Sequence, residues 1–201
     1  HAHPVPEACH KVGESSVEIG AHYFENVLGL KSHLIEKQLK KFGFRFFFSD
    51  GQRALAAVTE LGASRPLPVP SWQIDRGIFE NFLGEEVQRQ GVRFVDQAIV
   101  RGLDLSQDDA PHRVRWQRAG GEVQSTNARW VIDASGRAGL IKRKLGLGLD
   151  NAHHAHAVWF RIGERLNIDD WCDDAGWRAR CVTPTRWLST NHMVGSGYWL
   201  W

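Results

Sequence analysis

Cysteine, methionine and long apolar runs are all scarce in this chain of 201 residues. The cysteines are Cys9, Cys172 and Cys181, which lie far apart, are odd in number and include no C-x-x-C pair. This usage argues against a disulfide framework or a zinc site, and we expect reduced thiols in a cytoplasmic protein. No apolar run reaches the length of a transmembrane helix, so we expect no membrane partner.

An excess of charge of one sign is also missing. The net charge is +2, with 25 basic and 23 acidic residues interspersed along the chain. Such a balance does not indicate a nucleic acid or an anionic membrane as partner. We also expect no metal site. His1, His3 and His10 lack cysteine or carboxylate partners at ligand spacing. In a histidine-rich edge strand, a period of two places His154 and His156 on one face and His153 on the other.

The composition is otherwise that of a soluble globular protein, with 42% hydrophobic and 24% charged residues. Nine tryptophans are unusual for this length. They fit an aromatic-lined pocket for a planar ligand, although large aromatic side chains also fill ordinary cores. The chain begins at His1 without a methionine and ends at Trp201 inside an apolar, strand-like run. We therefore expect an internal piece of a longer protein.

The stretch 130–147 has the clearest local pattern. Its apolar start, residues 130–132, has the β-branched character of a strand buried on both faces. Asp133 and three small residues follow, and then a short helical pattern. Such a turn brings backbone N–H groups close to an oxygen-rich ligand, because small side chains do not block the approach. The alternative is an ordinary turn between strand and helix, since Asp, Ser and Gly are common in turns.

A second turn of this kind lies near the start of the chain. Gly13, Glu14, Ser15 and Ser16 precede residues 17–28, whose apolar positions recur at helical spacing. We predict that Ser15 or Ser16 caps the helix. The helix N-terminus would then face an anionic or carbonyl-bearing ligand. The alternative is a glycine turn with a capping serine and no ligand.

An aromatic strand follows Lys41. Residues 42–48 read F-G-F-R-F-F-F, and a period of two puts the even-numbered phenylalanines on one face, which we predict to be a core face. Lys41 would share the other face with Gly43 and Arg45 and project into an open cavity. Lys40 would point into the phenylalanine face. The alternative is a solvated lysine pair at the end of a helix.

The remaining elements are predicted from turn and cap signals. Residues 71–74 look extended, whereas residues 65–70 contain three prolines and are not a central strand. Asp75 is expected to cap a helix that ends at Gly91, with Arg76 as a surface charge or a ligand contact. The acidic stretch 169–174 is expected to be a solvated turn. Further strands are predicted at 92–95, 98–105, 112–117, 122–127 and 157–162.

Several of these motifs resemble those of flavin-dependent halogenases of the tryptophan-halogenase type. D-A-S-G-R at 133–137 resembles the second flavin motif of FAD-dependent monooxygenases, reductases and halogenases, and D-R-x-x-F at 75–79 is found across the same class. V-G-E-S-S-V at 12–17 resembles the G-E-[AS]-[ST] segment of the halogenases. Residues 41–46 fit the halogenase pattern K-x-x-[IF]-[KR]-F, and residues 199–201 are the first half of W-x-W-x-I-P.

The resemblance implies roles for particular residues. Lys41 would be the catalytic residue, holding the hypohalous acid that the family makes from reduced FAD, O2 and halide. The substrate would be an aromatic or other organic small molecule, and a flavin reductase would serve as electron source. The resemblance places these residues beside the FAD: Gly13, Glu14, Ser15, Ser16, Arg76, Asp133, Ala134, Ser135 and Gly136.

The resemblance also implies an α/β fold of composite α+β type. Residues 1–150 would form an incomplete glutathione-reductase-like FAD-binding domain, with 42–75 contributing to the substrate side. Residues 151–201 would start a mostly antiparallel substrate-domain sheet. The sequence lacks the G-x-G-x-x-G turn that should hold the pyrophosphate, the C-terminal Gly-Asp flavin motif and a Glu matching the family's second catalytic acid. We therefore expect the fragment alone to be inactive.

Two other functions fit the same residues. A hydroxylase or reductase of the same fold would share D-A-S-G-R and D-R-x-x-F but would not need Lys41. A non-catalytic binding module would use the Trp-rich sheet as a surface for protein or lipid. Halide-dependent turnover separates a halogenase from a hydroxylase, and a bound flavin spectrum separates an enzyme from a binding module.

Overall fold

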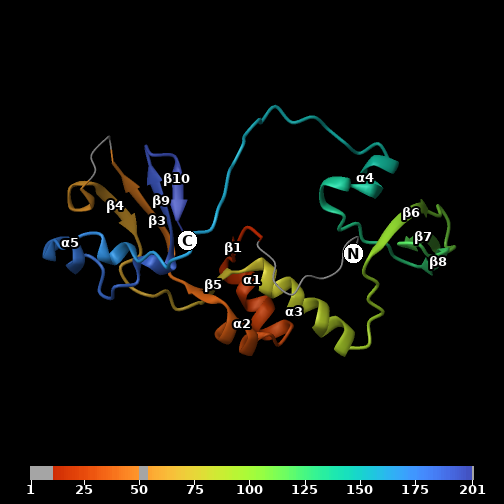
Figure 1. Ribbon diagram of the computed structural model, residues 1–201, viewed down its shortest axis with the longest axis horizontal. Helices are drawn as coiled ribbons and strands as arrows, with labels where there is room; N and C mark the ends of the chain where they lie inside the picture. Colours follow the sequence, from red (N-terminus) through yellow and green to blue (C-terminus); the bar gives the residue numbers. More distant parts are fainter. Residues whose placement is uncertain (1–10, 50–53, 201) are drawn as a thin grey trace. The chain divides into compact units, whose positions relative to one another are not determined.

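The computed structural model describes residues 11–49 and 54–200. His1, His3, His10 and Trp201, which entered the sequence predictions, lie outside the described residues. The chain forms two compact units (Figure 1). Unit 1 contains Asn81–Val158, and unit 2 contains the described parts of Ala8–Glu80 and Trp159–Trp201. The functional division at residue 150 stays a prediction.

A three-stranded sheet, sheet A, organises the first half of unit 2. Its strand order is β1-β5-β2, and both pairings are antiparallel. The central strand β5 is buried along its whole length, which confirms the extended conformation predicted for residues 71–74. The strands are β1 (Glu14–Ser15), β2 (Leu39–Lys41) and β5 (Ser71–Ile74). Helical elements of this part of the chain are α1 (Glu18–His22), the π-helix η1 (Tyr23–Val27), α2 (Lys31–Lys37) and α3 (Arg76–Arg89).

A four-stranded sheet, sheet B, completes unit 2 with the strand order β10-β9-β3-β4. The central pair β3 and β9 is parallel and the outer pairs are antiparallel, so the sheet is mostly antiparallel, as predicted. Its strands are β3 (Gly43–Phe48), β4 (Thr59–Gly62), β9 (Ser189–Val194) and β10 (Tyr198–Leu200). Short helices connect them: η2 (Leu55–Ala57), η4 (Ile168–Asp170), α5 (Ala175–Ala179) and η5 (Arg186–Leu188).

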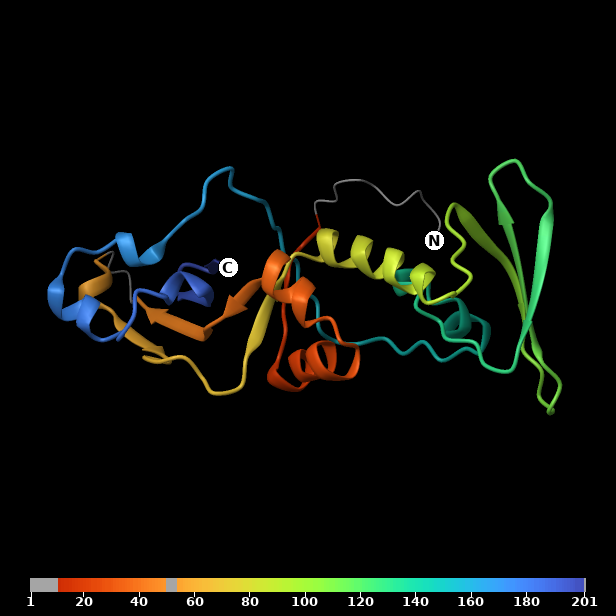
Figure 2. The same ribbon diagram turned by 90° about the horizontal axis from the view of Figure 1, so that it is seen from below.

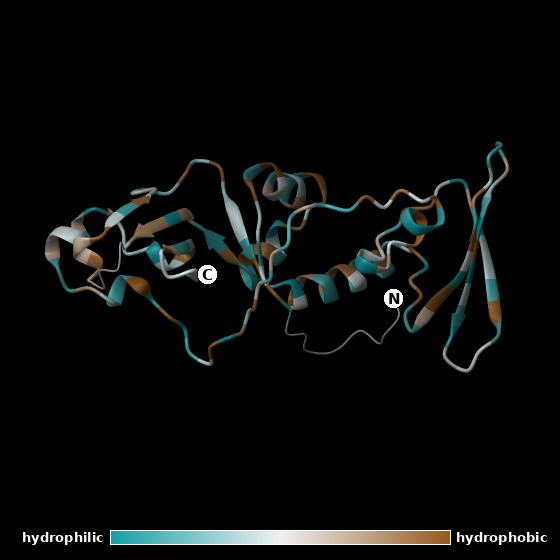
Figure 3. Ribbon diagram, turned by 90° about the horizontal axis from the view of Figure 1, so that it is seen from above, coloured by the Kyte–Doolittle hydropathy of each residue, from teal (hydrophilic) through white to brown (hydrophobic). Residues whose placement is uncertain are grey.

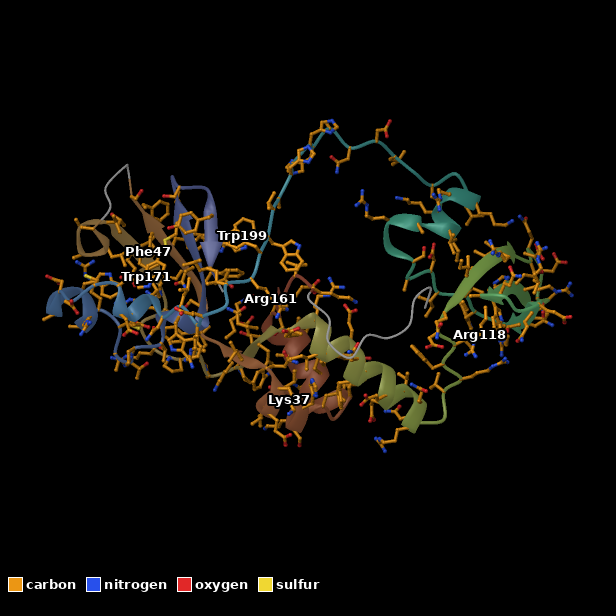
Figure 4. All side chains as sticks on the ribbon, viewed as in Figure 1. Lys37, Phe47, Arg118, Arg161, Trp171 and Trp199 are labelled. Carbon is orange, nitrogen blue, oxygen red and sulfur yellow. The ribbon has the colours of Figure 1, made fainter. Side chains whose placement is uncertain are left out.

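The core of unit 2 covers one face of sheet B. Phe47 is 1% exposed and packs with Val58, Ile168, Trp177 and Met193. Trp199 lies on the opposite face, because its register partner His192 aligns with Phe46 rather than with Phe47 (Figure 4). The two faces of this sheet therefore differ, with one packed as a core and the other carrying half-exposed aromatic rings.

Unit 1 is built around an antiparallel meander, sheet C, with the strand order β6-β7-β8 (Figure 2). The strands are β6 (Ala98–Asp104), β7 (His112–Arg118) and β8 (Val123–Ala128). Gly120 has a φ of 69° in the turn between β7 and β8, which confirms the predicted hairpin. A 3₁₀ turn, η3 (Gly136–Ala138), and the helix α4 (Leu140–Lys144) follow. Within the described residues, no helix is both long enough and apolar enough to span a membrane.

The side of the aromatic strand that faces the core after Phe42 is not the predicted one. Phe42 is buried as expected, but Phe44 is 50% exposed, and the residues that face the core are Arg45 and Phe47. The cause is a break in the strand at Gly43, whose φ of 137° is accessible to glycine and not to residues with a side chain. From Gly43 onward the side chains therefore alternate between the two faces in the opposite order, so that Phe44 does not share the face of Phe42.

Three predicted strands do not form. Residues 92–95, 130–132 and 157–162 have no strand conformation. An isolated strand cannot satisfy its backbone N–H and C=O groups, and none of the described strands pairs with these segments. Their apolar side chains stay in solvent, with Trp130 83%, Ile132 90% and Phe160 78% exposed. Figure 3 shows that hydrophobic residues occur in extended chain as well as in the packed elements.

Candidate active site

Lys41 ends β2 and is buried, with 8% of its surface exposed. Its Nζ donates a hydrogen bond to the carbonyl oxygen of Ser16 (3.2 Å) and lies 4.0 Å from the centroid of the Phe44 ring. Burial lowers the pKa of Lys41, and the carboxylate of Glu18 opposes this shift only in part. The side chain is thus a buried amine held by a carbonyl and an aromatic ring.

The neighbouring Lys40 occupies a different environment. It was predicted to point into the phenylalanine face, but its side chain is exposed. In β2 it pairs in register with Trp72 of the central strand, whereas Lys41 pairs with Ser71. Because successive side chains of a strand point to opposite faces, burial of Lys41 leaves Lys40 in solvent. The two lysines therefore form a natural matched pair for mutagenesis.

Ser16 does not cap a helix as predicted. Helix α1 starts after Val17, which makes no side-chain capping bond. Ser16 instead belongs to the edge of sheet A, where its N–H donates to the Trp72 carbonyl (2.7 Å) and its Oγ accepts from the Trp72 N–H (2.7 Å). Ser16 therefore pairs with the buried strand β5 instead of capping the helix. The same bonds aim the Ser16 carbonyl at Lys41.

Ser15 connects the two sheets of unit 2. Its Oγ donates to Oε1 of Gln73 in β5 and lies 2.9 Å from the hydroxyl oxygen of Thr190 in β9. Gln73 also donates through Nε2 to the Leu188 carbonyl (3.4 Å). Gln73 and Thr190 are both buried, so this polar bridge is shielded from water. The residues predicted to touch a cofactor therefore also hold the lysine-bearing strands in place.

Glu14 and Arg76 meet as an ion pair. Arg76 Nη1 lies 2.9 Å from Glu14 Oε1, and Arg76 Nη2 lies 2.6 Å from Glu80 Oε1. Glu80 also pairs with Lys11, and the Glu80 carboxylate raises the pKa of Arg76. The Arg76 side chain is 36% exposed, which leaves one side open to solvent. Gly13 lies half-buried in irregular chain next to this ion pair in sequence.

Asp75 caps α3 as predicted. Its Oδ1 accepts from the N–H groups of Gly77 (2.9 Å) and Ile78 (3.3 Å). Its Oδ2 accepts from Nη1 of Arg161 (2.9 Å), whose other terminal nitrogen donates to the Lys11 carbonyl (3.0 Å). Arg161 thereby ties a segment from late in the chain to the start of α3.

The Asp133 turn lies in unit 1 and is held by local bonds. Asp133 Oδ1 accepts from the Ser135 N–H (3.0 Å), and Oδ2 accepts from the Ile141 N–H (2.7 Å). The Ser135 Oγ accepts from the Leu140 N–H (3.2 Å). Hydrogen bonds from the Ser135 side chain and from the backbone N–H of Ile141 lower the pKa of Asp133. The carboxylate therefore organises its own turn.

Gly136 is exposed in this turn and has open space around its backbone. Its φ is 61°, and a Cβ added there would meet no atom within 4 Å. Ala134 and Ser135 are exposed as well. The small side chains and the positive φ fit close approach of an oxygen-rich group to the backbone.

The structure brings the predicted residues of unit 2 together, whereas the predicted residues 133–136 form a turn of their own in unit 1. Ser15, Ser16 and Lys41 gather on sheet A, and Glu14 meets Arg76 at its edge. The turn 133–136 belongs to unit 1 and makes its bonds within residues 133–141.

The sequence prediction missed a buried charge network in unit 2. Arg186 is 1% exposed, and it donates to Glu60 Oε1 (2.8 Å), Asp169 Oδ1 (3.1 Å) and the Trp177 carbonyl (2.8 Å). Arg45 pairs with the same Glu60. Asp169 was expected in a solvated turn and Arg45 beside a cavity, and both expectations are wrong. Partners so far apart in sequence leave no periodic signal.

Comparison with known structures places the fold among flavoproteins. A flavoprotein/dehydrogenase from Cytophaga hutchinsonii matches 73% of this chain and 35% of its own, with a TM-score of 0.57 and 23% identity. CmlS, a flavin-dependent halogenase, matches 69% of this chain and 24% of its own, with a TM-score of 0.54 and 29% identity. The predicted fold class, a partial FAD-binding α/β fold, is confirmed.

The family follows from sequence. Residues 6–161 match the tryptophan halogenase family, and the chain belongs to that family. The flavin-dependent halogenase chlA of Dictyostelium discoideum is 26% identical over 96% of this chain and 34% of its own length. The flavin-dependent halogenase armH5 of Armillaria mellea is 26% identical over 66% of this chain and 26% of its own. The chain thus spans about a third or less of these relatives.

Proposed function

We propose that this chain is the lysine-bearing part of an FAD-dependent halogenase that acts on an aromatic or other organic small molecule. The single observation that supports this most strongly is the buried amine of Lys41, at the position where the family pattern has its lysine. A lysine side chain without a catalytic role normally lies in solvent, as that of Lys40 does.

The chemistry proposed for Lys41 follows from its surroundings. Reduced FAD with O2 would supply the oxidising power that converts a halide into hypohalous acid. The Lys41 ammonium donates a hydrogen bond to the oxygen of hypohalous acid. As the oxygen–halogen bond breaks, the halogen passes to a substrate carbon, and the hydroxide released combines with the proton lost from that carbon to form water. Burial lowers the pKa of Lys41, which favours the neutral amine more than in an exposed lysine.

The proposed FAD contacts differ in what they offer. Gly136 and its small neighbours fit a close backbone approach, and Arg76 with Glu14 presents a charged pair at the surface. The hydroxyls of Ser15 and Ser16 are already hydrogen-bonded within the protein. We therefore assign backbone contacts to Gly13, Ser15, Ser16 and Ala134, and side-chain contacts to Arg76. Asp133 and Ser135 shape the turn around Gly136.

The test compares Lys41→Ala with Lys40→Ala in the full-length protein. Halide-dependent product formation should fall by several orders of magnitude in Lys41→Ala, because a group acting in the chemical step is removed. FAD content and O2 consumption should stay normal. Lys40→Ala should keep both the product and the flavin chemistry.

The outcomes separate the candidate functions. Equal product formation by the two variants would overturn the proposed role of Lys41. An oxygenated product formed without halide would make the protein a hydroxylase. Absence of a bound flavin spectrum in the full-length protein would favour a binding module.

A further inference from the structure

Lys41 and Phe44 are three residues apart, a spacing that puts side chains on opposite faces of a regular strand. In this structure they nevertheless meet, with Lys41 Nζ 4.0 Å from the Phe44 ring centroid. The break at Gly43, with its φ of 137°, reverses the alternation and brings the ring under the amine. The contact depends on a backbone conformation that only glycine adopts readily.

The Phe44 ring contributes little to the packing of the core. It is 50% exposed, whereas Phe42 and Phe47 on either side of it are 5% and 1% exposed. The ring of His192 also lies beside it, and the centroids of the two rings are 5.7 Å apart. An exposed phenylalanine on a strand contributes little to the core, so its packing does not explain its position.

Within residues 11–49 and 54–200, Lys41 has no carboxylate at salt-bridge distance, although a buried cation usually has such a partner. In the described part of the chain its Nζ contacts the Ser16 carbonyl and the Phe44 ring and forms no salt bridge. A direct carboxylate would fix the positive charge and block the amine. A carbonyl and a ring face hold the group while leaving it able to react.

We infer that Phe44 is a positioning residue for Lys41, holding the amine by its ring face at the place where hypohalous acid is bound. This inference rests on the proposed catalytic role of Lys41. The ring attracts the ammonium through its quadrupole, so it both orients the side chain and favours its charged form. Phe44 does not itself touch the reacting atoms.

Titratable groups on other elements also act on Lys41 and Phe44. Glu18 acts on Lys41 from α1, and it favours the charged amine. His192 faces Phe44 from β9, and burial lowers its pKa, which favours the uncharged ring that does not repel Lys41. Neither group replaces the aromatic contact.

The experiment compares Phe44→Leu, Phe44→Tyr and Phe48→Leu in the full-length protein. Leucine keeps most of the apolar bulk but has no ring face, and tyrosine restores the ring. Phe48 lies on the same face of β3, is 38% exposed and stacks on Phe46, so Phe48→Leu is a matched control. Two quantities are measured: halogenation kinetics, and the pH dependence of Lys41 labelling by an amine-selective reagent, located by mass spectrometry.

In Phe44→Leu we expect kcat to fall about tenfold at unchanged KM, because the amine loses its orientation. The midpoint for Lys41 labelling should move down by about half a pH unit, since the charged form loses the ring. Phe44→Tyr and Phe48→Leu should match the parent protein in both measurements. A labelling midpoint in Phe44→Leu equal to that of Phe48→Leu would overturn the inference.

The labelling result is independent of turnover, so the two proposals fail separately. If Lys41→Ala keeps full activity, the proposed catalytic role is wrong whatever the labelling shows. If Lys41→Ala is inactive but Phe44→Leu keeps its kcat and its labelling midpoint, only the positioning role of Phe44 is wrong.

Discussion

Two regions that carry family motifs, the surroundings of Lys41 and the Asp133 turn, are held in different ways. In unit 2, Ser15, Ser16 and Lys41 are fixed by partners from β3, β5 and β9, many of them buried. In unit 1, the turn around Asp133 is fixed by hydrogen bonds within nine residues and is largely exposed. The lysine region thus has its geometry imposed by tertiary structure, and the Asp133 turn has its geometry imposed by its own sequence.

This difference fits the two tasks proposed for them. An amine that must stay buried without a carboxylate needs a rigid surrounding, because desolvation of a cation is costly. A turn that approaches a ligand with its backbone needs open space and small side chains. Changes in the packing of unit 2 should therefore disturb Lys41, while changes in the Asp133 turn should act locally.

The largest effect is expected from Arg186→Met, which removes the centre of the buried charge network. Asp169 would remain buried without its cationic partner and Glu60 would keep only Arg45, so the free energy of unfolding should fall by about 3–5 kcal/mol. Denaturant unfolding of the full-length protein measures it. The exposed pair of Arg178 and Asp173 provides the control, since Arg178→Met should cost less than about 1 kcal/mol. Equal losses would contradict the buried network.

A smaller loss is expected from Gly43→Ala. An alanine at a φ of 137° is strained by about 1–3 kcal/mol, and relief of that strain would move Phe44 away from Lys41. Stability and halogenation should both decrease. Gly20→Ala in α1 is the control, because Gly20 has open space around it and ordinary helical geometry. There alanine should be neutral or stabilising.

Gly136→Leu tests the Asp133 turn. A leucine at a φ of 61° costs about 1 kcal/mol and fills the space where a ligand would approach. The FAD content of the purified full-length protein should fall at least about tenfold while unit 2 stays intact. Gly148→Leu, at a glycine with open space and no positive φ, should keep its flavin. Normal FAD content in Gly136→Leu would leave the turn with a structural role only.

The smallest effect is the pH dependence of the Asp133 turn. Hydrogen bonding lowers the pKa of Asp133 in the folded chain below its unfolded value of about 3.9. The stabilisation is therefore complete above the unfolded pKa and is lost as pH falls through the lowered one. NMR signals of the Ser135 and Ile141 amides should shift below pH 4 and stay constant above pH 5. A shift centred near neutral pH would contradict the assignment.

What the sequence could predict depended on whether the signal was local. The Gly120 hairpin, the Asp75 cap and the turn before α4 were predicted correctly, because turn and cap residues act on their immediate neighbours. The catalytic role of Lys41 was predicted from the family pattern and stays a prediction. The faces of the aromatic strand were predicted wrongly, although Gly43 in its middle was a visible sign of a break.

The remaining errors share one physical cause. The apolar run 130–132 has strand propensity, but a strand exists only with a partner, and no propensity encodes that partner. Arg186 and Asp169 look like surface charges in sequence and are buried because Arg186 joins Asp169 to Glu60, which lies far along the chain. Tertiary pairing decided each of these positions.

The hydroxyl bridge between Ser15 and Thr190 has a consequence for the order of folding. The two residues are 175 positions apart, and β9, which carries Thr190, also pairs with the strand next to Lys41. Closing so long a loop is entropically costly and therefore slow. Ser15 reaches Thr190 only when β9 docks, so the surroundings of Lys41 take their final form late in folding. The reactivity toward hypohalous acid proposed for Lys41 would then arise at the end of folding, together with the structure that contains it.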